Sequence, residues 1–325
     1  MSSTRSKLIN LLSKSNHDYI SGQQLSDALQ ISRNAIWKHM NELKKDGYEI
    51  EGIPKKGYRI ISYPNKVSEN TIQWGLETSW IGKKVYHRES IDTTQRLAHQ
   101  LALDGAEHGT IVIADEQTKG KGRTGRHWQS HRSKGVWMSI ILRPSILPYK
   151  APQLTLVTAT VIASLIKEMT GLTPHIKWPN DILINGKKVA GILTEMQAEQ
   201  DQINYVIIGI GLNVNQLDSD FEHSVTYPFT SLKIESAKSW SITRIIQSML
   251  KLFEIKYKNF IDNGFNDVKE EWEQYGFKIN EKIAIKTNNR TWNGIFLGIA
   301  EDGALLIKND LEKVEKVYSA EIMWF

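Results

Sequence analysis

The spacing of apolar residues in the first sixty positions predicts three helices followed by two strands. Leucines recur at helical spacing in TRSKLINLLSKSN, and a short second helix is expected over residues 21–29. Residues 31–47 have the period of a third helix, with Ser32 as its N-cap. Two short strands around a Pro-Lys-Lys-Gly turn are expected over residues 48–62. Three helices and a basic hairpin, in this order, are typical of a winged helix.

The third helix has an apolar and a polar side. At about 100° per residue, Ile36, Met40 and Leu43 fall on one narrow arc, and a wider polar arc lies beside it. We expect the polar arc to enter the major groove of DNA while the hairpin reaches the flanking backbone. Two alternatives stay open, namely that these charges only solvate the helix and that Trp37 packs at the edge of the core. The residues expected to contact DNA are Ser32, Arg33, Asn34, Trp37, Lys38, Lys44, Lys45, Lys55 and Lys56.

Charge and composition support this interpretation. Residues 1–63 contain ten Lys and Arg against six Asp and Glu, so most of the formal net charge of +5 lies at this end. The chain has no cysteine, which excludes disulfides and thiolate chemistry and fits a reducing compartment. It also lacks a signal-peptide pattern and an apolar run of about 20 residues. We therefore expect a soluble, cytoplasmic protein with a nucleic-acid-binding module.

A glycine-rich segment, residues 120–125, has the G-x-G-x-x-G spacing of a dinucleotide-binding turn. A strand is expected before it, but a polar and then β-like segment follows, where that turn requires a helix. Arg126 and His127 also replace the Lys-Ser/Thr pair of a Walker loop. We therefore predict a different anion-binding loop, with a ligand-free basic surface loop as the alternative. Between residues 117 and 167 no Asp or Glu occurs, but nine cations do: Lys119, Lys121, Arg123, Arg126, Arg132, Lys134, Arg143, Lys150 and Lys167.

The rest of the chain reads as alternating helices and strands. Residues 151–171 predict a buried helix, and a strand, a turn and a returning strand are expected over 177–197. A buried strand over 204–216 contains glycines that allow a ligand or backbone to come close. Two helices over 241–275 precede a small β-barrel that begins after residue 276. The histidines do not cluster at metal-ligand spacing.

Three motifs, in this order, carry a family resemblance: GKGRTGRHW, KWPNDILINGKKVAGIL and GIGLNVN. They resemble the biotin–protein ligases, and the N-terminal winged helix resembles the bifunctional bacterial form that also represses the biotin operon. The resemblance covers essentially the whole chain and implies an α+β multidomain fold. Its expected parts are a winged helix-turn-helix domain (1–64), a catalytic α/β domain with a mixed sheet like that of class II aminoacyl-tRNA synthetases (65–275) and an SH3-like β-barrel (276–325).

The resemblance implies a two-step reaction and a regulatory role. Biotin and ATP, with Mg²⁺, would give biotinyl-5′-AMP, and the biotin would then pass to a lysine of a carrier domain, as in acetyl-CoA carboxylase or pyruvate carboxylase. Biotinyl-5′-AMP would also act as corepressor and favour a homodimer on operator DNA. Two alternatives remain open, namely a ligand-responsive repressor without catalysis and a lipoate-type ligase.

The same resemblance assigns site residues, although two segments depart from the family pattern. IDTTQ stands where the family usually has Ser-Thr-Asn after an Asp, and Lys121 and Thr124 stand where arginines are common. Arg123 and Lys188 are the expected catalytic residues, and the Mg²⁺ ligands are not identified. The expected biotin-binding residues are Thr93, Thr94, Gln95, Gln117, Gly120, Lys121, Gly122, Arg123 and Lys188. The expected ATP or adenylate contacts are Arg126, Trp128, Asn180 and Asn213.

Overall fold

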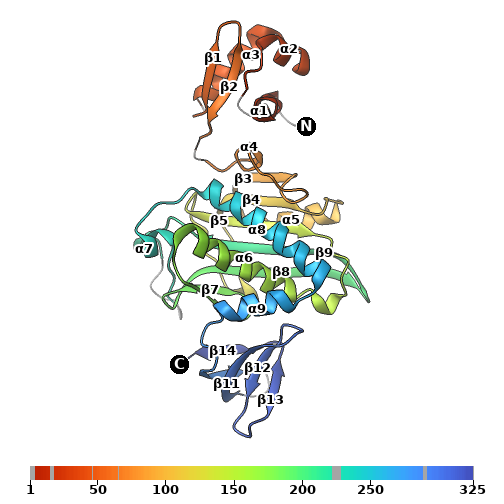
Figure 1. The fold of residues 1–325 in the computed structure, drawn as a ribbon, viewed down its shortest axis with the longest axis vertical. Coiled ribbons are helices and arrows are strands. Elements are labelled where there is room, and N and C mark those ends of the chain that lie inside the picture. The colour runs from red at the N-terminus through yellow and green to blue at the C-terminus, as the bar shows by residue number, and fades with distance from the viewer. Residues whose placement is uncertain are drawn as a thin grey trace. The chain divides into compact units, whose positions relative to one another are not determined.

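The computed structural model divides the chain into two compact units (Figure 1). One consists of Met1–Glu77 with Ser241–Gln247, and the other of Thr78–Trp240 with Ser248–Phe325. Within the part of the chain that the structure describes, no helix is long and apolar enough to cross a membrane. The structure describes residues 4–14, 18–45, 47–64, 66–221, 228–287 and 291–324.

The N-terminal unit has the predicted winged-helix order. Ser21 caps the second helix by accepting a hydrogen bond from the Gln24 amide at 3.1 Å. Ser32 caps the third in the same way, at 3.2 Å from the Ala35 amide, and Gly47 follows that helix with a positive φ of 93°. The elements are α1 (Thr4–Lys14), α2 (Gly22–Leu29), α3 (Arg33–Lys45), the antiparallel strands β1 (Glu49–Ile53) and β2 (Gly57–Ser62), and α4 (Glu69–Gln73).

The core of this unit confirms the predicted apolar arc of α3. Ile36, Met40 and Leu43 are buried together with leucines of α1 and α2 and with Ile60 of β2. Trp37, one position along from Ile36, is 60% exposed, so the alternative that it packs at the core edge is wrong. The polar arc of α3 is therefore exposed, and the Trp37 side chain lies on it.

A seven-stranded mixed sheet forms the centre of the second unit. Only β3 and β4 run parallel, joined by α5 (Thr94–Leu103), and the other neighbours are antiparallel. The mixed sheet predicted for this domain is confirmed. In spatial order the strands are β3 (Val85–Ile91), β4 (Thr110–Gln117), β5 (Gly135–Leu142), β9 (Gln202–Asn213), β8 (Lys187–Glu199), β7 (Asp181–Ile184) and β6 (Pro174–Lys177).

Helices cover the central sheet. Helix α6 (Gln153–Thr170) is buried on nearly all sides, as predicted, and ends at Gly171, whose φ is 73°. Helices α6 and α8 (Ile242–Asn263) cross the same face of the sheet (Figure 1). Helix α9 (Asn266–Tyr275) packs against α6, and α7 (Leu232–Ser236) follows β9. Short 3₁₀ turns occur at Arg123–Gly125, Pro148–Lys150 and Asp218–Asp220.

The C-terminal residues of the same unit form a five-stranded antiparallel sheet, the SH3-like domain expected there. Buried isoleucines and Phe296 form its interior. The Trp178 indole donates to the Gly303 carbonyl at 3.1 Å, and the Gln153 amide donates to the Glu301 carbonyl at 3.0 Å. These bonds fix the domain to the start of α6 and to the turn before β7. In spatial order the strands are β13 (Val314–Val317), β12 (Leu305–Lys308), β11 (Thr291–Ile299), β10 (Lys282–Lys286) and β14 (Glu321–Trp324).

Candidate functional site

A cavity of about 900 Å³ opens on the face of the central sheet opposite α6. Thr155 of α6 bonds to Thr194 of β8 at 2.8 Å, whereas Leu193 lines the cavity. Because neighbouring strand residues point to opposite faces, α6 and the cavity lie on different sides of β8. The volume suits a ligand of nucleotide size.

Most of the sequence-predicted ligand residues meet in this cavity, although they come from five separate segments. They lie at the start of α5, at the end of β4, in the glycine-rich loop, in the turn before β7 and on β8. Those that line the cavity are Thr93, Thr94, Gln95, Gln117, Lys121, Gly122, Arg123, Arg126, Trp128, Asn180 and Lys188.

Two predicted residues, Gly120 and Asn213, do not line the cavity. A Cβ at Gly120 would lie 2.4 Å from the Trp128 carbonyl oxygen, so glycine is required there by the loop's own backbone. The Asn213 amide is buried and is already bonded at 3.0 Å to the Thr230 carbonyl and to Gln216. In this structure both residues support neighbouring loops, and their assignment as ligand contacts stays a prediction.

The glycine-rich loop is an irregular hairpin. Gly122 donates to the Arg126 carbonyl at 2.7 Å, and Trp128 donates to the Gly120 carbonyl at 2.9 Å. Thr124, at the tip, has a positive φ of 54°. The chain then enters β5, not a helix, so the prediction that this is no dinucleotide-binding turn is confirmed.

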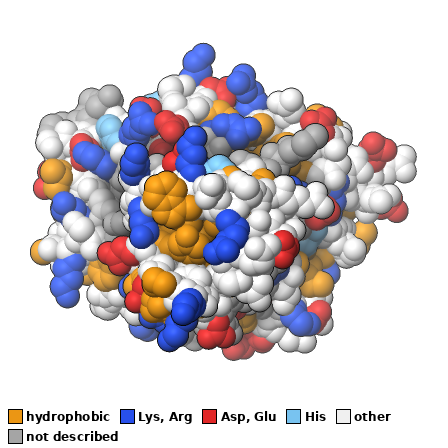
Figure 2. Space-filling view, turned by 90° about the horizontal axis from the view of Figure 1, so that it is seen from above, with side chains coloured by type: hydrophobic (Ala, Val, Ile, Leu, Met, Phe, Trp, Pro, Cys, Tyr) orange, Lys and Arg blue, Asp and Glu red, His pale blue; other side chains and the backbone are white. Residues whose placement is uncertain are grey.

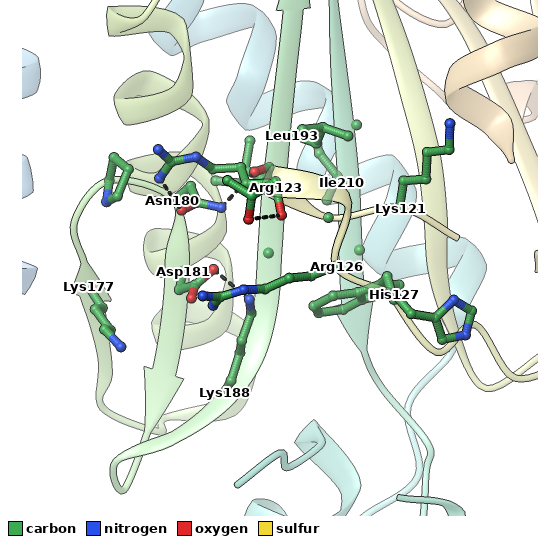
Figure 3. Close-up of a pocket in the computed structure, with 18 of the residues that line it drawn as sticks. Lys121, Arg123, Arg126, His127, Lys177, Asn180, Asp181, Lys188, Leu193 and Ile210 are labelled. Atoms are coloured by element: carbon green, nitrogen blue, oxygen red, sulfur yellow. Dashed lines mark hydrogen bonds and ion pairs between the residues drawn. The ribbon is translucent and has the colours of Figure 1, made fainter. Parts of the chain in front are cut away.

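The hairpin directs cations toward the opposite wall of the cavity. Lys177, Asp181 and Lys188 lie on one side of the cavity, and Lys121 and His127 lie on the other (Figure 3). Asp181 is the one carboxylate that lines it among the described residues. The cations that line the cavity together with it are Lys121, Arg123, Arg126, Lys177, Lys188 and Lys286.

Burial and the surrounding charges shift the pKa of the Arg123 guanidinium. Burial lowers this pKa, Asp181 opposes that shift, and the neighbouring Arg126 adds to it. A half-buried arginine beside another cation is stabilised by an incoming anion. The cavity is therefore built for a ligand that carries several negative charges.

Two cations are held in place by consecutive residues, Asn180 in the turn before β7 and Asp181 at the start of β7. Arg123 donates to Asn180 Oδ1 at 3.1 Å, and Asn180 Nδ2 donates to the Ile192 carbonyl at 2.9 Å. Lys188 Nζ lies 2.6 Å from Asp181 Oδ1 and 5.2 Å from the centroid of the Trp128 ring. Figure 3 shows both interactions at the same wall. The turn thus brings together cations that are 65 positions apart in the chain.

The glycines of β8 and β9 explain how Trp128 fits. Gly191 and Gly211 face each other across the two strands, and a Cβ at Gly211 would lie 2.5 Å from the Trp128 ring. A Cβ at Gly209 would lie 2.6 Å from Gln95 Oε1. The close approach expected at these glycines is therefore made by protein side chains in this structure.

A buried polar network closes the end of the cavity near α5. The Gln117 side-chain carbonyl accepts from the Thr94 amide at 2.8 Å, and its amide donates to Ser130 Oγ at 2.9 Å. Ser139 Oγ donates to Gln95 Oε1 at 3.0 Å and contacts Thr94 Oγ1 at 2.9 Å. These bonds fix the residues that stand where the family usually has Ser-Thr-Asn.

Sequence reasoning missed the part of the cavity wall that comes from the C-terminal domain. Lys286, Thr287, Ser319 and Ala320 line it from more than 70 positions beyond β9. No motif marks them, because only tertiary packing brings that domain to the site. Lys177 stands in the KWPND motif, but the motif alone does not predict a role for its side chain.

Some cations of the acid-free window serve the fold. Arg143 donates to the carbonyls of Ala102, Ala106 and Asn204, and Lys134 pairs with Asp220 at 2.5 Å. Of the nine cations in that window, only Lys121, Arg123 and Arg126 line the cavity. The acid-free window therefore contributes three cations to the cavity, and its other six lie elsewhere.

The second candidate surface is the exposed side of α3 with the hairpin turn. Arg33, Asn34, Trp37, Lys38 and Lys44 are exposed along the helix, and so are Lys45, Lys55 and Lys56. Ser32 is exposed at the helix start, where its hydroxyl is used as the cap. Figure 2, taken from above the view of Figure 1, shows Lys and Arg side chains around exposed hydrophobic atoms.

Together these features define a class: a DNA-binding winged helix joined to an α/β unit with a cation-lined ligand cavity. Comparisons with known proteins agree with each part. Residues 4–59 match the HTH domain family, residues 88–213 match the biotin/lipoate A/B protein ligase family, and residues 278–323 match the biotin protein ligase C terminal domain.

Some relatives match over nearly the whole chain. The bifunctional ligase/repressor BirA of Bacillus subtilis is 46% identical over 99% of this chain and 98% of its own length. BirA of Escherichia coli is 28% identical over 94% of this chain and 92% of its own length. A biotin protein ligase from Aquifex aeolicus, solved in complex with biotin and ATP, has a TM-score of 0.64 and 28% identity, and the match covers 74% of this chain and 97% of that chain. This chain belongs to the biotin–protein ligase family, in its bifunctional ligase/repressor form.

Proposed function

We propose that this chain joins biotin to ATP as biotinyl-5′-AMP and transfers the biotin to a lysine of carrier domains. The observation that carries the proposal is the cavity, which among the described residues is lined by six Lys and Arg side chains and one carboxylate. A carboxylate and a triphosphate repel each other, so a site that unites them needs fixed cations on several sides.

In the first step a biotin carboxylate oxygen attacks the α-phosphorus of ATP, and the bond to the β-phosphate oxygen breaks to release pyrophosphate. Arg123 and Lys188, which converge on the turn at Asn180–Asp181, hold the carboxylate and the α-phosphate. Their charges stabilise the negative charge that spreads over the five-coordinate phosphorus. Trp128, packed against Gly211, supports Lys188 and the adenine end.

The residues present fit a magnesium ion that arrives with ATP. Asp181 Oδ1 is buried, and among the described residues its one close partner is Lys188 Nζ, at 2.6 Å. Mg²⁺ is commonly held by one or two carboxylates together with substrate phosphates, so Asp181 is the residue that would hold it. When bound, the ion neutralises charge on the phosphates. No group of three His, Asp or Glu able to hold a metal alone occurs in the described part of the chain.

In the second step the neutral amine of a carrier lysine attacks the acyl carbon of the mixed anhydride. The acyl C–O bond to phosphate breaks, AMP leaves, and the amine loses a proton as the amide forms. The cavity side of the C-terminal domain, with Lys286 and Ser319, stands where the nucleotide and the carrier would meet. No covalent bond to the enzyme is needed, which agrees with the absence of cysteine.

We propose that the winged helix represses genes of biotin synthesis and uptake, in the cytoplasm, with biotinyl-5′-AMP as corepressor. The exposed cations of α3 and of the hairpin turn support contact with DNA phosphates. Adenylate binding would favour a homodimer, whose two recognition helices could read a two-fold operator.

The ligase is tested by incubating the full chain with labelled biotin, ATP, Mg²⁺ and a biotin carrier domain. Acid-stable label on the carrier is the expected result. No label would defeat the ligase, and label from lipoate in preference to biotin would favour the lipoate-type alternative. Failure to release pyrophosphate would favour a repressor without catalysis.

The regulatory part is tested by operator binding and by sedimentation, each with and without biotin plus ATP. The expected result is tighter DNA binding and a shift from monomer to dimer when both ligands are present. Indifference to the ligands would remove the corepressor role and leave the ligase intact.

A further inference from the structure

The surface of α3 carries an aromatic side chain that the fold does not use. Trp37 is 60% exposed, whereas tryptophans are among the more buried residues on average. It lies about one turn into α3, whose inner side is occupied by Ile36, Met40 and Leu43. The core of the N-terminal unit is complete without the Trp37 ring.

The exposed Trp37 ring has charged and polar neighbours on the surface of α3. At helical spacing its neighbours on the outer side of α3 are Arg33, Asn34 and Lys44, and Lys38 lies about 100° farther round the helix; all four are exposed. Arg33, Lys38 and Lys44 are not paired with a carboxylate among the described residues, and Glu42, one turn after Lys38, pairs with Arg5 and His39 instead. Trp37 therefore lies in the middle of a cationic surface that is itself unpaired.

A polyanion with an apolar patch is the ligand that fits such a surface. In a helix-turn-helix the first residues of the recognition helix contact base edges, while cations farther along contact phosphates. An indole has one donor and a large apolar area, so it contributes little to phosphates. The apolar group that the major groove displays is the C5-methyl of thymine.

We propose that Trp37 is a specificity-determining residue that contacts the 5-methyl group of a thymine in the major groove of each operator half-site. The inference rests on the proposed DNA binding and goes beyond it, because it assigns one base to one side chain. Lys38 and Lys44 then supply contacts to phosphate that carry no sequence information.

The experiment uses the full chain with biotin, ATP and Mg²⁺, and duplexes selected by it from a random-sequence library. Each thymine of the selected duplex is replaced in turn by uracil, which removes only the methyl group. For one thymine per half-site we expect affinity for the wild-type chain to fall about fourfold, the value of one buried methyl. The wild-type protein is used unaltered, so folding of a variant does not enter this arm.

The second arm measures Trp37→Ala on the same duplexes, with Trp37→Phe as the conservative variant. Trp37→Ala is expected to weaken the thymine duplex about tenfold and to bind thymine and uracil duplexes equally. Trp37→Phe should keep part of the preference for thymine. Lys38→Ala is the matched control, since it should weaken both duplexes alike and keep the preference.

The outcomes separate the two proposals. If the wild-type chain selects no sequence, the proposed repressor function fails. If it selects a sequence but no uracil replacement weakens binding, or if Trp37→Ala keeps the preference for thymine, the assignment of Trp37 is overturned while DNA binding stands. Dimerisation lost in Trp37→Ala without any change in base preference would overturn it too, in favour of a contact between protein copies.

Discussion

At the residue scale, the site depends on cations whose positions are set by uncharged or oppositely charged neighbours. Arg123 is held by Asn180, and Lys188 is held between Asp181 and the Trp128 ring. Fixed charges need no reorganisation when the reaction begins, and this is why preorganised donors accelerate charge-separating steps.

Replacing Lys188 by alanine tests this directly. We expect kcat for pyrophosphate release to fall about 100- to 1,000-fold, the usual effect of removing one preorganised donor. Lys187→Ala is the matched control, because Lys187 is the neighbouring strand residue and does not line the cavity. Equal kcat values for the two variants would contradict the role of Lys188.

Gly211→Ala tests the support of Trp128. Its Cβ would lie 2.5 Å from the ring, so the ring must move or the strands must separate, at a cost of about 1–3 kcal/mol. We expect a lower free energy of unfolding in urea and a raised KM for ATP. Gly22→Ala is the control, since its Cβ would meet nothing closer than 3.7 Å. An unchanged KM for ATP would mean that Trp128 does not support the nucleotide.

A site residue can be predicted from sequence when it stands in a recognisable motif. Arg123 and Lys188 stand in ordered motifs, and the structure brings both to one cavity. Asn213 also stands in a motif, yet its amide is used inside the protein. A motif records which residues matter to a site but not whether they touch ligand or support a neighbour.

At the element scale, a carboxylate of α8 secures the loop that leads into β3. Glu254 accepts hydrogen bonds from the backbone amides of Ser79, Trp80 and Ile81, at 2.7–3.3 Å. Burial alone would raise the pKa of Glu254, but these amides hold it below the ordinary value. The ionised form is therefore favoured in the folded state.

This shift predicts a dependence of stability on pH. A lowered folded-state pKa adds stability that is present above the unfolded value of about 4.3 and is lost as pH falls through the folded value. Glu254→Gln should therefore lower the Tm at pH 7, with a loss of about 1–3 kcal/mol in the free energy of unfolding. The decrease of Tm below pH 5 should be less steep in this variant than in the wild type. Glu270→Gln, an exposed carboxyl on α9, is the control. If the Tm of Glu254→Gln decreased below pH 5 as steeply as that of the wild type, the lowered pKa of Glu254 would be contradicted.

Elements were predictable where local chemistry fixes their ends. Ser32 caps α3 as predicted, Ser21 caps α2, and Gly171 ends α6. The order of the strands in the central sheet was not predictable, because β9 pairs with β5 from a distant part of the chain. Nothing in either strand's own sequence specifies its partner.

At the scale of the whole molecule, the cavity is completed by a domain that sequence motifs did not connect with it. Lys286, at the end of β10, lines the cavity together with residues of the central sheet. We therefore expect the ligase to require its C-terminal domain for binding the nucleotide as well as for stability.

Charge reversal at Lys286 tests that requirement. Lys286→Glu is expected to raise the KM for ATP about tenfold or more, because a contact to a charged ligand is lost and a like charge is added. Lys282→Glu, on the same strand but outside the cavity, is the control. Equal KM values for the two variants would show that the C-terminal domain does not reach the nucleotide.

The most direct test of the central claim is exchange of labelled pyrophosphate into ATP, measured without any carrier protein. A cavity that unites a carboxylate with the α-phosphate of ATP should catalyse this exchange only when biotin is present, and Arg123→Ala should lose it. Exchange that proceeds without biotin, or that survives in Arg123→Ala, would contradict the proposed role of the cavity.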